Sequence, residues 1–114
     1  MANPRSSNGN ARRKLRLWLK SQGRPCWICQ AFGRDAEIDY SLPSRHPYSF
    51  EVDELVPVSK GGSPFDRNNV DAVHRRCNQW RGNRSVAEVM RIARSGGSHP
   101  PPTSAVEGTT SREW

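Results

Sequence analysis

Residues 11–22 show the hydrophobic pattern of an amphipathic helix. Apolar side chains recur at helical spacing on one side, and basic side chains fill the other. Asn10 suits the N-cap and Gly23 the end of such a helix. The inward face carries Leu15, Trp18, Leu19 and Gln22.

A second helical pattern lies nearer the carboxyl end. Ser85 followed by Glu88 is a capping-box pair, which predicts the start of a helix of about ten residues. The side chains that repeat at helical spacing after this cap are Val86, Val89, Met90 and Ala93.

The middle of the chain favours strands. Residues 50–56 predict a first strand that ends before Pro57, and residues 69–73 a short second strand. Residues 74–81 lack strand formers, so we expect a helix there that ends at Gly82. Strands and helices in this order predict a small α+β domain.

Composition limits the size of the hydrophobic core. The chain has 114 residues, 33% of them apolar, and a mean hydropathy of −0.87. This supports one small domain, which we assign to residues 11–94. The polar residues 1–10 predict a disordered basic arm, and the Gly, Pro, Ser and Thr of residues 95–114 predict a disordered tail.

The formal net charge of +7 is unevenly distributed, because residues 1–20 hold six basic side chains and no acidic one. Such an arm suits phosphate backbones, although a solvated basic face would carry the same charge. We expect DNA contacts from Arg12, Arg13, Lys14, Arg16, Arg75 and Arg84.

Apolar runs in the chain are short. None reaches the length of a membrane span, and the amino terminus lacks the apolar core of a signal peptide. We therefore expect a cytoplasmic protein that has no membrane partner.

The three cysteines and one histidine form two half-sites for a metal. Cys26 and Cys29 are separated by two residues, as are His74 and Cys77. Together they predict a tetrahedral structural zinc site, which would stabilise a thin core. A buried cysteine pair with an unrelated thiol, or a disulfide with one cysteine left over, is the alternative. The odd cysteine count argues against the disulfide.

Two adjacent acids, Asp53 and Glu54, lie within the first predicted strand. Side chains alternate along a strand, so one of the two must meet the core side. Asn78 follows the zinc ligand Cys77 on a helix that the chain order can bring back across Asp53. Carboxylate and amide oxygens are ligands suited to Mg²⁺ or Mn²⁺.

The motifs in this region resemble those of the HNH endonucleases, also called ββα-metal or His-Me finger nucleases, and especially of their bacteriophage versions. The resemblance covers about Cys26 to Asn83 and includes the paired zinc half-sites. It rests on the order of Val-Asp-Glu-Leu-Val-Pro-Val-Ser-Lys-Gly-Gly, Asn-Asn-Val and His-x-x-Cys-Asn-x-x-Arg-Gly-Asn. It implies a ββα-metal fold closed by a Cys-Cys-His-Cys zinc and flanked by helices.

The resemblance also implies roles for single residues. Asp53 falls at the position of an acidic metal ligand, and Asn78 at the helix position that completes the catalytic Mg²⁺ or Mn²⁺ site. Asn69 matches the asparagine that braces the loop between the strands and orients the general base. Arg81 matches a basic residue that lies close to the scissile phosphate in relatives.

Glu54 departs from the pattern, because the family usually has a water-activating histidine at this position. A carboxylate is a weaker base than imidazole by about two pKa units. Glu54 remains a candidate base, and nearby His46 is a candidate base or extra ligand.

The function implied by the resemblance is metal-dependent hydrolysis of DNA phosphodiester bonds, and we expect nicking by a monomer or weak dimer. A phage-encoded enzyme would act in the host cytoplasm. One alternative is a DNA-binding accessory without activity. Another is a zinc-stabilised module for protein contact, for instance with a phage terminase.

Overall fold

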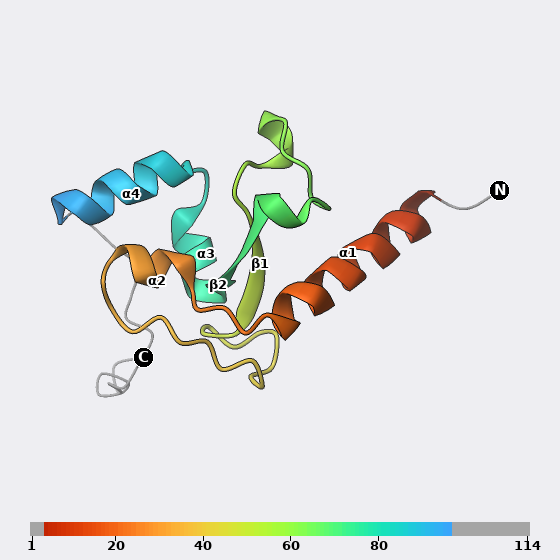
Figure 1. Ribbon diagram of the computed structural model, residues 1–114, viewed down its shortest axis with the longest axis horizontal. Helices are drawn as coiled ribbons and strands as arrows, with labels where there is room; N and C mark the ends of the chain where they lie inside the picture. Colours follow the sequence, from red (N-terminus) through yellow and green to blue (C-terminus); the bar gives the residue numbers. More distant parts are fainter. Residues whose placement is uncertain (1–3, 97–114) are drawn as a thin grey trace.

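The computed structural model describes residues 4–96 and shows an α+β arrangement, in which helices surround one two-stranded antiparallel sheet (Figure 1). Two single 3-10 turns, Val58–Lys60 and Arg67–Asn69, lie between the strands. The remaining elements are α1 (Pro4–Ser21), α2 (Trp27–Ala31), β1 (Phe50–Glu54), β2 (Val70–His74), α3 (Arg75–Arg81) and α4 (Val86–Ser95).

The sheet pairs Phe50 with His74 at one end and Glu54 with Val70 at the other. Strand β1 ends at Glu54, two residues before the predicted end at Val56. The backbone N–H and carbonyl of Val56 bond to the side chain of Asn69 and not to a neighbouring strand. Strand β2 begins at Val70, one residue after the predicted start, since Asn69 belongs to a 3-10 turn.

The core lies where the sheet meets the helices. Its members come from α1, α2, both strands, α3, α4 and the segment before β1, and three of them are cysteines. The metal half-sites are thus part of the small core that composition predicts. The buried apolar residues are Leu15, Leu19, Cys26, Ile28, Cys29, Ile38, Phe50, Val70, Ala72, Val73, Cys77 and Val89.

Helix α1 begins at Pro4 and extends away from the rest of the fold (Figure 1). The predicted start after Asn10 is therefore wrong, and residues 4–10 of the predicted disordered arm are helical. Proline is favoured in the first turn of a helix, where its missing N–H is not needed. Residues 1–3 lie outside the described part of the chain.

Helix α4 begins as predicted. The Oγ of Ser85 accepts a hydrogen bond of 3.0 Å from the backbone N–H of Glu88, and Gly96 ends the helix in a left-handed conformation. The expected tail of residues 95–114 lies outside the described residues, apart from Ser95 in the helix and Gly96 at its end. Within residues 4–96, no helix combines the length and apolarity needed to cross a membrane.

Candidate functional site

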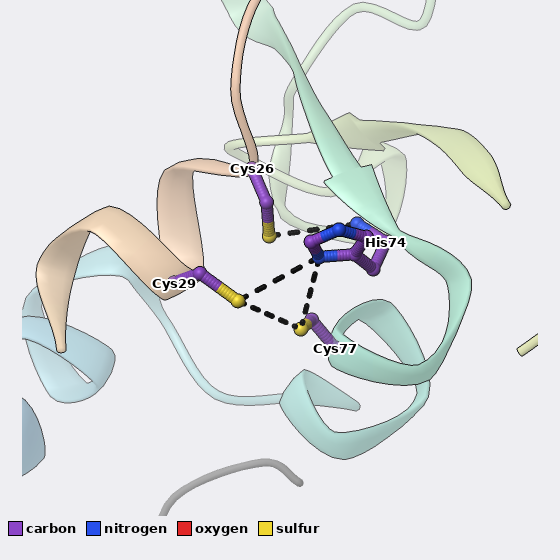
Figure 2. Close-up of side chains that lie close together, drawn as sticks. All are labelled: Cys26, Cys29, His74 and Cys77. Carbon is purple, nitrogen blue, oxygen red and sulfur yellow. Dashed lines mark hydrogen bonds between the residues drawn. The ribbon is translucent and has the colours of Figure 1, made fainter. Parts of the chain in front are cut away.

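Four candidate metal ligands converge from the two predicted half-sites (Figure 2). Cys26 caps α2 and Cys29 lies within it, so a single helical turn carries the first pair. His74 ends β2 and caps α3, and Cys77 lies in the first turn of that helix. Each pair therefore uses the start of a short helix to present two side chains to one point.

The geometry of this cluster suits a tetrahedral ion. All four ligand atoms lie within 4.8 Å of one another, and all four residues are buried. The Sγ of Cys29 lies 3.6 Å from the Sγ of Cys77 and 3.6 Å from the Nδ1 of His74. A tetrahedron with zinc–sulfur bonds of about 2.3 Å has edges near 3.8 Å. The cluster can therefore hold a structural metal ion such as zinc.

Hydrogen bonds orient the ligands. The Nε2 of His74 donates to the backbone carbonyl of Glu37 at 2.9 Å, and its Nδ1 faces the sulfur atoms (Figure 2). Histidine ligands in proteins are commonly fixed in this way. The backbone N–H of His74 also donates to the Sγ of Cys26 at 3.5 Å.

The three cysteines are free and buried, so the disulfide alternative does not hold. Hydrogen bonds from Cys26 and then from Cys77 lower the pKa of the Cys29 thiol to about 3. The contacts with Cys26 and Cys29 raise the pKa of Cys77. A second thiolate in this cluster is unfavourable without a cation, which is the charge balance that zinc provides.

Helix α3 crosses β1 directly after the metal cluster. Asn78 donates through Nδ2 to Oε1 of Glu51 at 2.9 Å, and Arg81 donates through Nη1 to Oδ2 of Asp53 at 2.5 Å. Alternation along the strand brings Glu51 and Asp53 to the face that meets α3. Sequence reasoning missed Glu51, although its position two residues before Asp53 on one strand face was a usable signal.

Asp53 lies at the meeting point of α2, β1 and α3 and is 6% exposed. The indole N–H of Trp27 donates to its Oδ2 at 2.8 Å, and Arg81 donates to the same oxygen. Burial raises the pKa of Asp53, and the charge of Arg81 opposes that shift. The hydrogen bonds that the described residues make to Asp53 all reach Oδ2, so Oδ1 is left for a further partner.

Arg81 is only 2% exposed, and its guanidinium is used inside the protein. Besides Asp53, it donates to the backbone carbonyls of Arg84, Glu54 and Leu55 at 2.9, 3.2 and 2.8 Å. The expected position close to a phosphate therefore has to be corrected. Arg81 holds the backbone where β1 ends, because this fold turns its side chain inward onto a buried carboxylate.

Glu54 points to the opposite side of the strand from Asp53, as the alternation predicts. Its Oε2 lies 3.5 Å from Nη1 of Arg12 on α1, and its side chain is 25% exposed. The contacts of Asp53 and Asn78 are therefore made on the face of β1 that meets α3, whereas the contact of Glu54 is made on the opposite face.

Asn69 braces the loop between the strands, as expected. Its Oδ1 accepts from the backbone N–H of Val56 at 2.9 Å. Its Nδ2 donates to the carbonyls of Val56 and Ser63, each at 2.9 Å. Together with Arg81, this side chain fixes the backbone on both sides of Leu55.

His46 is half-buried at the other end of the strand. Its Nδ1 accepts from the backbone N–H of Tyr48 at 3.0 Å, and the two rings lie 5.8 Å apart. His46 precedes Phe50, whereas Glu54 ends β1, and a strand of this length spans about 13 Å. The structure thus does not bring His46 into contact with Glu54.

The expected DNA contacts fall into two groups. Arg12, Arg13 and Arg16 line a cleft of about 460 Å³ between α1 and β1, and Lys14 is exposed on the same helix. The others make internal contacts: Arg75 donates to the carbonyl of Ser44, and Arg84 stacks over Trp80 and donates to its carbonyl.

Comparison with protein families, with curated proteins and with solved structures gives no match for this chain.

Proposed function

We propose that this protein is an HNH-type, metal-dependent endonuclease that hydrolyses phosphodiester bonds of DNA. The crossing of β1 by α3 carries the proposal. It sets the amide of Asn78 against Glu51 and the guanidinium of Arg81 against Asp53, which directly precedes Glu54. The chain order of β1, β2 and α3, with a metal cluster at the β2–α3 junction, agrees with the arrangement that the resemblance implies. The loop brace by Asn69 agrees with it as well.

The catalytic ion of this proposal would be Mg²⁺ or Mn²⁺, held by Asp53 and Asn78. Both side chains have the hard oxygen ligands that these ions prefer. The described hydrogen bonds use Oδ2 of Asp53 and Nδ2 of Asn78, which leaves one oxygen on each. Arg81 already balances the charge of Asp53, so a divalent cation competes with this guanidinium. When bound, the cation supplies positive charge to the phosphoryl and leaving oxygens.

The other steps of the proposed reaction are assigned to side chains of the protein. Glu54 accepts a proton from the water that attacks phosphorus, while the bond from phosphorus to the 3′ oxygen breaks and that oxygen takes a proton from solvent. Arg81 and Asn69 act as positioning residues, because they hold the backbone on both sides of Leu55. The arginines of α1 bind the phosphate backbone.

Nicking of supercoiled plasmid tests the proposal. The zinc-loaded parent should nick with Mg²⁺ or Mn²⁺, and Glu54→Gln should lower the rate by about 100-fold or more. Glu88→Gln is the matched control, since it removes a partly exposed carboxylate of α4 and should leave the rate unchanged. A parent that fails to nick with any divalent ion would overturn the assignment.

A DNA-binding accessory without activity is the second candidate. One observation favours it: Asp53 and Glu54 are both ion-paired, to Arg81 and Arg12. Binding of DNA with no cleavage under every divalent ion would select this candidate.

A further inference from the structure

The cleft between α1 and β1 has walls of opposite charge. Arg12, Arg13 and Arg16 line it from the helix, and Val52 and Glu54 line it from the strand. Glu51 also borders the cleft, but its carboxylate accepts a hydrogen bond from Asn78 on α3. Helix α1 has no acidic residue between Pro4 and Ser21, so nothing on that wall balances its cations. This helix also lies outside Cys26 to Asn83, the part of the chain that resembles HNH nucleases.

One ion pair spans the cleft. The Nη1 of Arg12 lies 3.5 Å from Oε2 of Glu54, and the side chain of Arg12 is 59% exposed. An ion pair so open to solvent contributes little to stability. A guanidinium binds a phosphate in the same bidentate geometry that it uses for a carboxylate. Arg12 can therefore exchange Glu54 for a phosphate at small cost.

The spacing of the arginines suits a polymer of phosphates. Arg12 and Arg16 are one turn apart, about 6 Å along the helix axis. Phosphates of a DNA strand advance about 3.4 Å per nucleotide, so one strand presents phosphates to both side chains. The guanidinium of Arg16 is held 4.8 Å from the ring centre of Phe50, which fixes one end of the basic wall against β1.

We infer that this cleft seats the phosphodiester backbone of a DNA strand, and that a bound phosphate takes Arg12 away from Glu54. The exchange frees the Glu54 carboxylate beside the bound strand, on the face of β1 opposite to Asp53, for the role of base. The inference rests on the proposed function for that role of Glu54. The binding site itself rests on the α1–β1 geometry.

A double-mutant cycle for DNA binding tests the exchange. Glu54 weakens binding in two ways, by repelling phosphate and by occupying Arg12, and only the second requires Arg12. Fluorescence anisotropy would use a labelled strand of about 20 nucleotides and its duplex, the zinc-loaded full chain, and no Mg²⁺ or Mn²⁺. Arg12→Gln should weaken binding about fivefold. Glu54→Gln should strengthen it about threefold, and this gain should fall below about 1.5-fold when Arg12 is already Gln.

Helix α4 offers a matched control. Arg91 and Glu88 form an exposed pair at 3.9 Å away from the cleft, with side chains 67% and 44% exposed. Arg91→Gln, Glu88→Gln and their combination should each change affinity less than twofold and act additively. Circular dichroism and zinc content equal to those of the parent establish that each variant is folded.

Three results would overturn the inference. An equal gain from Glu54→Gln in both backgrounds would reduce Glu54 to a simple repulsive charge. Parent-like affinity in Arg12→Gln, Arg13→Gln and Arg16→Gln would place DNA elsewhere. Displacement by polyglutamate as effective as by unlabelled DNA of equal charge would assign the cleft to acidic protein. If the cycle gives the expected coupling but the parent never nicks plasmid, the DNA-binding cleft is supported and the proposed nuclease activity is not.

Discussion

Arg81 and Asp53 form a buried ion pair that joins the end of α3 to β1, with 2.5 Å between Nη1 and Oδ2 and side-chain exposures of 3% and 7%. The candidate metal ligand Cys77 lies one turn earlier on the same helix. One short helix therefore links the metal cluster to the carboxylate site. A change at either end should be felt at the other, because the helix spans only about 6 Å between the two residues.

Replacing Arg81 by Met should destabilise the fold strongly. The change leaves the buried carboxylate of Asp53 without its cation and removes the bonds to the carbonyls of Glu54 and Leu55. Breaking a buried pair in this way costs about 3 kcal/mol of the free energy of unfolding. Urea unfolding at a fixed excess of zinc measures it.

Arg84→Met is the matched control for this change, because Arg84 stacks on Trp80 nearer the surface and has no carboxylate partner among its described contacts. It should lose less than about 1 kcal/mol. A similarly small loss in Arg81→Met would mean that solvent or another cation satisfies Asp53.

Loss of one metal ligand should unfold the domain. Cys77→Ala removes a buried sulfur ligand from a cluster that occupies the small core, and structural zinc contributes on the order of 10 kcal/mol to folding. Circular dichroism, thermal melting and zinc content measure the effect, with the exposed neighbour Gln79→Ala as control. A metal-free Cys77→Ala protein with native circular dichroism and unchanged melting would contradict a structural role.

Gly62→Ala should displace the loop between the strands. An added Cβ would lie 1.7 Å from the backbone oxygen of Val56 and 2.9 Å from Nδ2 of Asn69, so the brace must open. Overpacking of this kind costs about 1–3 kcal/mol. Gly9→Ala is the control, since nothing lies within 4 Å of its added Cβ and alanine favours the helix by about 1 kcal/mol. Opposite shifts of the melting temperature are expected, and a neutral Gly62→Ala would mean that the loop does not need this close approach.

Glu54→His tests which side chain activates water. If the carboxylate is the base, imidazole at this position should restore or raise cleavage near neutral pH relative to Glu54→Gln. The rate of the histidine variant should fall below about pH 6.5, because the protonated imidazole accepts no proton. His46→Ala should cut like the parent. If Glu54→Gln cuts at the parent rate while His46→Ala does not, the base is His46.

Local patterns in the sequence were sufficient to predict the features that depend only on neighbouring residues. The two ligand pairs, the alternation at Asp53 and Glu54, and the cap at Ser85 each follow from spacings of one to three residues. Such spacings determine which side chains share a helix turn or a strand face, whatever the rest of the chain does.

The partners of the charged side chains were decided by the tertiary structure. Arg81 and Asp53 are 28 positions apart, and Arg12 and Glu54 are 42 apart, so no local period relates them. Their pairing depends on how α3 and α1 pack on opposite sides of β1. Burial then selects the inward partner of Arg81, because a carboxylate removed from water requires a cation close by. That requirement turned a residue expected at the phosphate into one that holds the end of β1.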